Sequence, residues 1–388
     1  MYGFQLWREF KLSIAEILAV FNDVEIMVSD TDILIIQSKS WDNEKLWKEI
    51  LEKSHMLWWC IKIMEISELA TITFEQKIFE LAEFHEWKFQ YWVTALWKKQ
   101  NLKWLLMWIK KTLRTEKISS RFVNKDFKSL SSAQIIWEKL VKRGTDFSLI
   151  FTSWKEFFGK TIWVQDIYAY SKRDYAKSRD MQVWMLPPKL SQMMINLAWA
   201  YSDNSSTIYD PFVWLGTILI EAELMWYKKL YGSDLNERMV ETSSTNVKNA
   251  QIEKLNAKFI HEATFWNDVK DWIIVTEWFL WEVMTKKNIS KERIWEQKES
   301  LIKLYSAFFE NLKKWWFSWT IVICFPFWEI RWKYYYFEEV YSIIEKYCEI
   351  LPYFPQNLDI KSTKMWSLLY KRDKQLVGRE IFRLEIKS

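Results

Sequence analysis

The feature that most constrains how this chain can fold is its ratio of tryptophan to glycine. The 388 residues include 28 tryptophans and 6 glycines, whereas average usage predicts about 27 glycines in a chain of this length. Many tryptophans stand where a tight turn needs glycine, as in segments 57–60, 210–217 and 313–320. Bulky side chains are strained at the positive φ angles that such turns require. The chain therefore lacks glycine where its own backbone needs it.

We interpret many of these tryptophans as glycines of an organism that decodes UGA as glycine. The alternative is a tryptophan-rich protein that binds carbohydrates or a membrane interface. That alternative leaves the missing glycines unexplained, because a tryptophan-rich binder still needs glycine at its turns.

The overall composition favours a cytoplasmic protein without a metal site or a membrane segment. The formal net charge is +5, which is compatible with nucleic-acid binding. Three cysteines are an odd number without metal-ligand spacing, as expected in a reducing compartment, and three histidines are too scattered for a metal site. We find no apolar run long enough to span a membrane and no signal-peptide pattern.

Residues 1–156 mix helical and strand patterns and predict an N-terminal α+β region. Helical spacing covers Leu12–Phe21, and apolar runs at Val24–Val28 and Ile33–Gln37 predict strands. A strand–helix–strand–helix series follows at Phe89–Thr94, Asn101–Thr115, Ser119–Val123 and Ser132–Arg143. Residues 157–188 are predicted to be a linker, because they are rich in charges and end at Pro187-Pro188.

Residues 189–388 alternate between strand and helix patterns, which predicts a parallel, doubly wound α/β sheet. Helices are expected at 189–200, Ile218–Met225, Glu237–Ala250 and Ser300–Leu312, and strands at Thr207–Tyr209, Lys229–Tyr231, Ala257–His261, Trp272–Thr276 and Thr320–Phe325. Ligands of such sheets bind beyond the carboxyl ends of the strands.

The strongest chemical signal is the segment from Ile208 to Ala222. A short strand ends in Asp210-Pro-Phe, and a loop containing Gly216 opens a helix. With glycine at Trp214, the loop reads Gly-x-Gly, which allows a cofactor to approach the backbone. Asp234 follows the next strand, where an acid can bind two ribose hydroxyls, although it can also cap the following helix. Glu262 follows the third strand, where a carboxylate can reach an adenine amino group or lie in a solvated turn.

These residues resemble class I S-adenosylmethionine-dependent methyltransferases, in particular the tRNA guanosine-N2 methyltransferases that carry a THUMP RNA-binding domain. The resemblance is strong over 180–235, where Trp184 stands in place of a family glycine, and weak over 30–120. It implies a Rossmann-like methyltransferase domain after a THUMP-like region, with S-adenosylmethionine as cofactor. The cofactor-binding positions are then Asp210, Phe212, Trp214, Gly216, Thr217, Asp234 and Glu262.

The fourth motif of the family, Asp/Asn-Pro-Pro-Tyr, is altered in this chain. The matching residues are Thr276, Glu277, Trp278 and Phe279. Phe279 keeps the ring that would stack on the target base, although it can also be a core residue. Thr276 replaces the acid or amide, and Glu277 falls at the first proline. We take Thr276, Glu277 and Phe279 as the candidate catalytic residues.

The resemblance implies transfer of a methyl group to the exocyclic amine of guanosine in tRNA or another structured RNA. Arg173, Arg179 and Lys189 are candidate RNA contacts, or else residues of a solvated turn. Two alternatives remain: a DNA amino-methyltransferase, and a non-catalytic RNA-binding protein on a decayed methyltransferase fold. The altered fourth motif favours the second, and the retained Asp210, Gly216 and Asp234 count against it.

Overall fold

The computed structural model divides into two compact units, Met1–Ile14 with Phe21–Ser171, and Ala15–Val20 with Lys172–Ser388. It describes residues 1–69, 73–83, 85, 88–96, 102–123, 126–127, 129–152, 155–168, 186–198, 206–249, 257–261, 272–277, 290–315, 320–373 and 375–387.

Among the described residues, the first unit is built on a mixed eight-stranded sheet in the order β2-β3-β1-β4-β8-β7-β5-β6. Strand β5 runs parallel to β6 and β7, and the other pairs are antiparallel. The strands are β1 (Tyr2–Leu6), β2 (Val24–Ser29), β3 (Ile33–Ser38), β4 (Cys60–Glu68), β5 (Phe89–Leu96), β6 (Ser120–Phe122), β7 (Thr145–Phe151) and β8 (Glu156–Val164).

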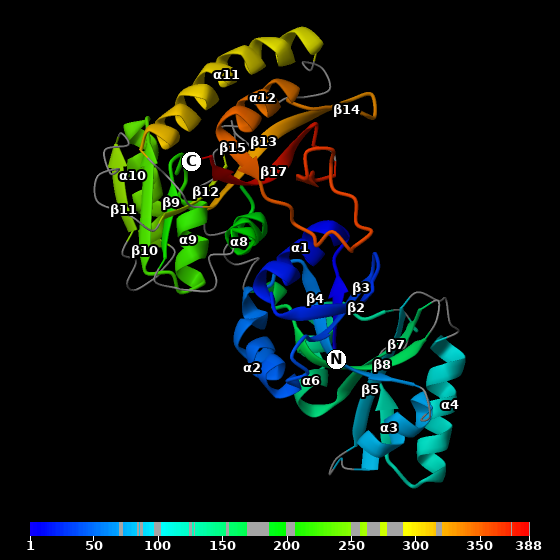
Figure 1. Cartoon of the computed structure of the whole chain (residues 1–388). Coiled ribbons are helices and arrows are strands. Elements are labelled where there is room, and N and C mark those ends of the chain that lie inside the picture. The colour runs from blue at the N-terminus through cyan, green and yellow to red at the C-terminus, as the bar shows by residue number, and fades with distance from the viewer. Residues whose placement is uncertain are drawn as a thin grey trace. The chain divides into compact units, whose positions relative to one another are not determined.

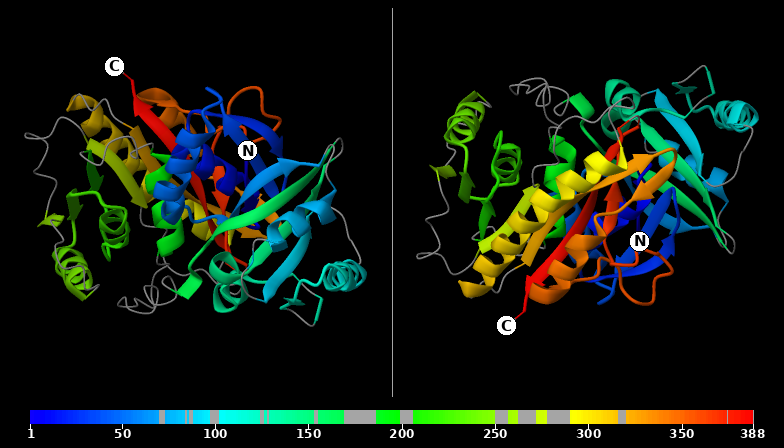
Figure 2. Two further views of the ribbon diagram at one scale, coloured as in Figure 1. Left: turned by 90° about the horizontal axis from the view of Figure 1, so that it is seen from below. Right: turned by 90° about the horizontal axis from the view of Figure 1, so that it is seen from above.

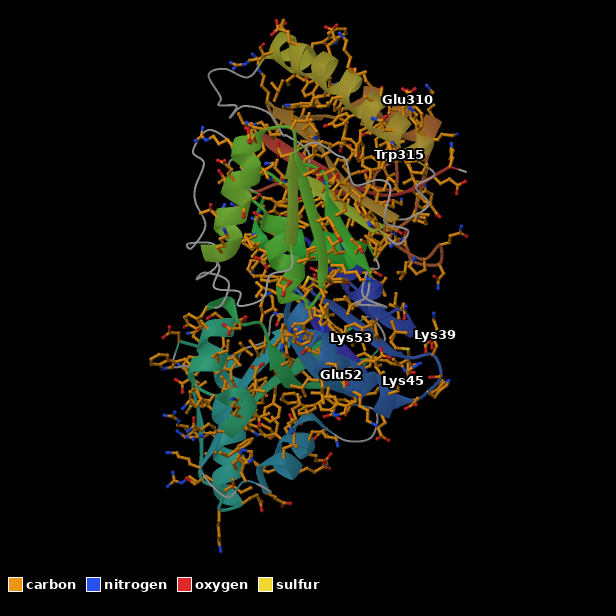
Figure 3. All side chains as sticks on the ribbon, turned by 90° about the vertical axis from the view of Figure 1, so that its left-hand side faces the viewer. Lys39, Lys45, Glu52, Lys53, Glu310 and Trp315 are labelled. Atoms are coloured by element: carbon orange, nitrogen blue, oxygen red, sulfur yellow. The ribbon has the colours of Figure 1, made fainter. Side chains whose placement is uncertain are left out.

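The helices of the first unit are α1 (Phe10–Val20), whose residues from Ala15 on belong to the second unit, α2 (Asn43–Lys53), the short η1 (Ser54–Met56), α3 (Phe74–Glu83), α4 (Leu102–Thr115), α5 (Ser132–Trp137) and α6 (Leu140–Arg143). Helices α2, α3 and α4 each bury an apolar face and expose charged residues on the other, whereas α1 is buried on nearly every side. In α2, Leu46 and Ile50 are buried, whereas Lys45, Glu52 and Lys53 lie on its charged side (Figure 3). This division follows the 3.6-residue period of an amphipathic helix.

The sheet of the second unit has the order β11-β10-β9-β12-β13-β17-β15, with β14 paired to β13 and β16 to β17. Strands β9 to β13 are parallel, and β17 is antiparallel to β13. The strands are β9 (Thr207–Asp210), β10 (Lys229–Asp234), β11 (Ala257–His261), β12 (Trp272–Glu277), β13 (Thr320–Ile330), β14 (Lys333–Tyr335), β15 (Cys348–Ile350), β16 (Leu368–Tyr370) and β17 (Val377–Ile386). Counted from β9, the first five strands lie in the order 3-2-1-4-5 of a Rossmann sheet.

Helices cover both faces of this sheet. They are α8 (Pro188–Leu197), α9 (Thr217–Leu224), α10 (Glu237–Asn249), α11 (Lys291–Lys314) and α12 (Glu338–Tyr347). Alternate residues of β13 separate the two faces: Ile321, Ile323 and Phe325 join the core under α11 and α12, whereas Cys324 contacts Met194 of α8. Both views in Figure 2 show α11 and α12, in yellow and orange, lying side by side along the red strand β17. This arrangement confirms the predicted doubly wound α/β domain.

Tryptophan is over-represented at left-handed backbone positions. Nine described residues other than glycine have positive φ, and five of them are Trp41, Trp214, Trp226, Trp332 and Trp366. Tryptophan makes up 28 of the 388 residues, so by chance fewer than about one of these nine would be tryptophan. The backbone therefore takes glycine geometry at several tryptophan positions, as the UGA interpretation expects.

Two of these positions have glycine-specific geometry. Trp226 follows α9 with φ 69°, its N–H donates to the Glu223 carbonyl over 2.8 Å, and the next N–H donates to Ala222. This is a Schellman cap, in which the left-handed residue is usually glycine. Trp332 has φ 66° in the two-residue turn between β13 and β14 (Figure 1) and is 93% exposed. Such a type I′ turn prefers glycine at its second position.

Three local predictions differ from the structure. The single helix expected over Ser132–Arg143 is two short helices, because Lys139 has φ 54° between them. Residue 157, the expected start of the linker, lies inside β8, which pairs with β4 and β7. Helix α11 begins at Lys291 rather than Ser300, because the Ser290 side chain accepts the N–H of Arg293 and caps the helix there.

Candidate active site

Three acidic residues end three neighbouring parallel strands of the second unit. Asp210 is the last residue of β9, Asp234 of β10 and Glu277 of β12. Strand β9 lies between the other two. Because the strands are parallel, their carboxyl ends lie at one edge, and the reversal of strand order at β9 marks the usual ligand position in such sheets.

The loop between β9 and α9 has two left-handed residues. Trp214 has φ 46° and Gly216 has φ 76°, and the Gly216 N–H donates to the Val213 carbonyl over 2.7 Å. A Cβ atom at Gly216 would lie 3.2 Å from the Cβ of Ser243 on α10. Glycine is thus required at 216 by both φ and space, and the backbone at 214 has the geometry of the first glycine in a Gly-x-Gly loop.

Asp234 connects the end of β10 to this loop. Its Oδ2 atom accepts the Trp214 N–H over 3.2 Å, and its Oδ1 atom accepts the Asn236 N–H over 2.9 Å. The side chain that caps α10 is Asn236, whose Oδ1 atom accepts the Arg238 N–H. Asp234 therefore precedes the cap, and its carboxylate fixes the loop where we expect the cofactor.

Asp210 and Thr276 form a buried pair across β9 and β12. The Thr276 hydroxyl donates to Oδ1 of Asp210 over 2.7 Å, and the Phe212 N–H donates to the same oxygen over 3.2 Å. Asp210 is 2% exposed and Thr276 is fully buried. Burial raises the pKa of Asp210 to about 7, against the opposing effect of these two hydrogen bonds. The hydroxyl of Thr276 is thus engaged inside the sheet, where Thr276 also pairs with Ile323 of β13.

Glu277 forms an ion pair with Arg379, a residue of β17. The Arg379 Nε atom donates to Oε1 of Glu277, and their side chains are 1% and 9% exposed. Burial raises the pKa of Glu277, and the guanidinium of Arg379 opposes this rise. We did not predict Arg379 from the sequence. Arg379 is one of four charged residues in the ten residues of β17, so no pattern in the sequence distinguished it.

The other candidate site residues do not all lie at the ends of β9, β10 and β12. Thr217 begins α9 and is buried. The ring of Phe212 lies 5.5 Å from that of Phe308 and packs on the core under α11. Burial lowers the pKa of Lys189 on α8 to about 8. Arg173, Arg179, Glu262 and Phe279 lie outside the described residues.

The described residues at the strand ends fit a nucleoside cofactor. The loop at 213–216 brings backbone close to the strand ends, and Asp234 places a carboxylate beside it. We find no cluster of three or more metal-ligating side chains in the part of the chain that the structure describes. No helix within that part has the length and apolarity needed to cross a membrane.

Comparison with solved structures gives full-length but remote likenesses. TrmN from Thermus thermophilus is 13% identical, with a TM-score of 0.49, covering 100% of this chain and 99% of that one. A predicted N6-adenine-specific DNA methylase from Listeria monocytogenes is 13% identical, with a TM-score of 0.43 and coverages of 98% and 95%. SMU.472, a methyltransferase complexed with SAH, is 10% identical, with a TM-score of 0.46 and coverages of 100% and 98%.

One family model matches the part of the chain that contains the loop between β9 and α9. No curated protein sequence matches the chain. Residues 179–265 match the family UPF0020, described as RMKL-like, methyltransferase domain. The matched segment includes β9, the loop with Gly216, and β10 with Asp234. Residues 179–265 thus resemble a methyltransferase domain, they lie on a Rossmann-like sheet, and the chain is an S-adenosylmethionine-dependent methyltransferase.

Proposed function

We propose that this enzyme is a cytoplasmic RNA methyltransferase that modifies the exocyclic amine of guanosine in tRNA or another structured RNA. The observation that carries the proposal is the position of Glu277 at the end of β12, next to the strand that begins the cofactor loop. An amine donates hydrogen bonds and a carboxylate accepts them, so this edge suits an amine substrate better than a carbon, which has no N–H to donate.

The cofactor contacts follow from the loop and the strand ends. Asp234 would accept the ribose hydroxyls, Glu262 the adenine amine, and the backbone of the 213–216 loop would lie against the cofactor. When bound, S-adenosylmethionine supplies a methyl group on positively charged sulfur, which keeps the bonding electrons as the substrate nitrogen takes the methyl. The Glu277 carboxylate and the Thr276 carbonyl would accept the amine hydrogens, and Glu277 would take the proton that nitrogen releases.

The target base must leave its helix to reach such an edge. The amine of a paired guanine lies within the groove, and enzymes that act on a base rotate it out and stack it. We propose Phe279 for that stacking, because it follows the end of β12 by two residues. Orientation and exclusion of water then supply most of the rate enhancement.

Helix α4 supports RNA binding by the first unit. It contains Lys103, Lys110, Lys111 and Arg114 and no acidic residue. All four are exposed, whereas the buried residues of α4 are Leu105, Leu106, Ile109 and Leu113. A row of cations of this kind favours phosphate contacts without base specificity. Together with Arg173, Arg179 and Lys189 of the second unit, it would make RNA affinity fall steeply with salt.

The test uses the natural chain, meaning full-length protein with the residue that the source organism inserts at each tryptophan position. It is incubated with S-adenosylmethionine labelled in the methyl group and with either tRNA or duplex DNA. We expect label in tRNA and not in DNA. Label in DNA alone would establish the DNA amino-methyltransferase alternative, and cofactor binding without transfer to either would contradict the proposal.

A further inference from the structure

Arg379 is a buried cation close to the methyl-transfer edge. It lies on β17, in register with Pro326 of β13, and is 1% exposed. Its Nε atom donates to the carboxylate of Glu277, which is 102 residues away in the sequence. The Arg379 side chain is the more deeply buried of the two, whereas the Glu277 side chain is 9% exposed. The ion pair thus joins the antiparallel half of the sheet to the end of β12.

Stability alone does not account for this pair. Removing a guanidinium and a carboxylate from water costs several kcal/mol per ion, and well-packed apolar residues are often as stable as a buried ion pair. Ile381, two residues along β17 and therefore on the same face of the sheet, is apolar and fully buried, so this face accepts an apolar side chain. The pair is therefore better explained by a requirement for charge at Glu277 than by the packing of β17.

Several other charged side chains also influence the ionisation of Glu277, and most of them are acidic. Among the described residues, Arg372 favours the anion of Glu277, whereas Glu277 in turn raises the pKa values of Asp210 on β9 and Cys324 on β13. Asp234 adds a further negative charge next to Asp210. Without Arg379, mutual repulsion and burial would both favour a protonated Glu277, and a protonated carboxyl has one acceptor oxygen fewer for the amine.

We propose that Arg379 is a positioning residue for methyl transfer, which holds Glu277 as an oriented anion at the end of β12 so that its free acceptor positions face the target amine. This inference rests on the proposed function, because Glu277 is the amine acceptor only if an amine is methylated. Arg379 acts through Glu277 and does not itself contact the substrate.

The first experiment follows the ionisation of Glu277 without any substrate. The natural chain, R379K and R379M are labelled with ¹³C at glutamate side-chain carboxyls, and the Glu277 signal, assigned by its loss in E277Q, is titrated. We expect its pKa to rise by about one unit or more in R379M and less in R379K. Identical titrations in all three proteins would overturn the proposal. A chain that fails to methylate tRNA would instead refute the proposed function, because this titration needs no activity.

The second experiment asks whether Arg379 acts through Glu277. Methyl transfer is measured against pH in R379K, in E277Q and in the double variant. We expect R379K to lower kcat about tenfold, to move the acid limb of the profile to higher pH, and to leave the cofactor Kd unchanged. In the E277Q background, R379K should have no further effect on kcat. Equal losses in both backgrounds would contradict a role through Glu277.

Arg383 provides the matched control. It lies on the same strand, is 3% exposed, donates to the Pro352 carbonyl and lies over the Tyr353 ring. The variant R383K should therefore lower stability to a similar extent without moving the Glu277 titration or the acid limb. If R383K moves both as R379K does, the effect is structural and the proposal is wrong.

Discussion

The Thr276 hydroxyl donates a 2.7 Å hydrogen bond to the Asp210 carboxylate, so the ends of β12 and β9 are joined inside the sheet. This contact explains how the chain tolerates an altered fourth motif. The position that we matched to the family's acid or amide is used to hold Asp210. Glu277, the next residue, ends the strand, and in the proposed function it supplies the charge that accepts the amine hydrogens.

The first prediction concerns this contact. Replacing Thr276 by valine removes a hydrogen bond that stabilises the Asp210 carboxylate, so the pKa of Asp210 should rise above about 7. Carboxyl-selective NMR titration measures the change. The variant T276S keeps the hydroxyl and should titrate like the natural chain, and a rise of equal size in T276S would show that the hydroxyl is not responsible.

The second prediction concerns the pH dependence of stability. Burial raises the pKa of Asp210 from 3.8 to about 7, so the folded state holds this proton more tightly than the unfolded state. The contribution of Asp210 to stability is therefore full below about pH 4, falls as the pH rises to about 7, and is constant above. Three pKa units correspond to at most about 4 kcal/mol. Urea unfolding of the natural chain and of D210N should give free energies whose difference follows this course. A difference that does not change between pH 4 and 7 would show that Asp210 is not perturbed.

The third prediction concerns the tryptophans. At position 226, which caps α9 with φ 69°, glycine should stabilise the chain as written by about 1–2 kcal/mol, because left-handed backbone is strained for other residues. Trp47 is the control, since it lies inside α2 and stacks on Tyr2, so W47G should destabilise. Thermal unfolding compares the two variants.

The coding DNA and the native protein test the same interpretation independently. We expect TGA codons at positions 184, 214, 278 and 281, and an intact mass below the 47.6 kDa of the sequence as written. TGG codons at these four positions, or a native mass of 47.6 kDa, would refute decoding as glycine.

The fourth prediction concerns the cofactor. Replacing Asp234 by alanine should weaken S-adenosylmethionine binding by roughly 1.5–3 kcal/mol, because charge-assisted hydrogen bonds are lost and the loop at Trp214 is released. Calorimetry on the natural chain, D234A and the exposed control D359A measures the change. Unchanged affinity in D234A would remove Asp234 from the cofactor site.

The sequence predicted the parts of the fold that depend on local patterns. The alternation of apolar strands and amphipathic helices was sufficient for the order of elements from β9 to β13, and Asp210, Gly216 and Asp234 follow their strands as expected. The contacts that the sequence did not reveal depend on the pairing of strands that are far apart in the sequence. Arg379 reaches Glu277 only because β17 inserts beside β13 in antiparallel orientation. Thr276 meets Asp210 because β12 pairs with β9, which no local pattern specifies.

The identity of the methylated nucleoside decides whether the enzyme modifies the exocyclic amine of guanosine. After incubation of the natural chain with methyl-labelled S-adenosylmethionine and tRNA, the RNA is digested to nucleosides and analysed by liquid chromatography and mass spectrometry. We expect labelled N2-methylguanosine, in an amount that falls strongly in E277Q and by less in R379K. Label in a different nucleoside, or no label in tRNA from a chain that binds the cofactor, would contradict it.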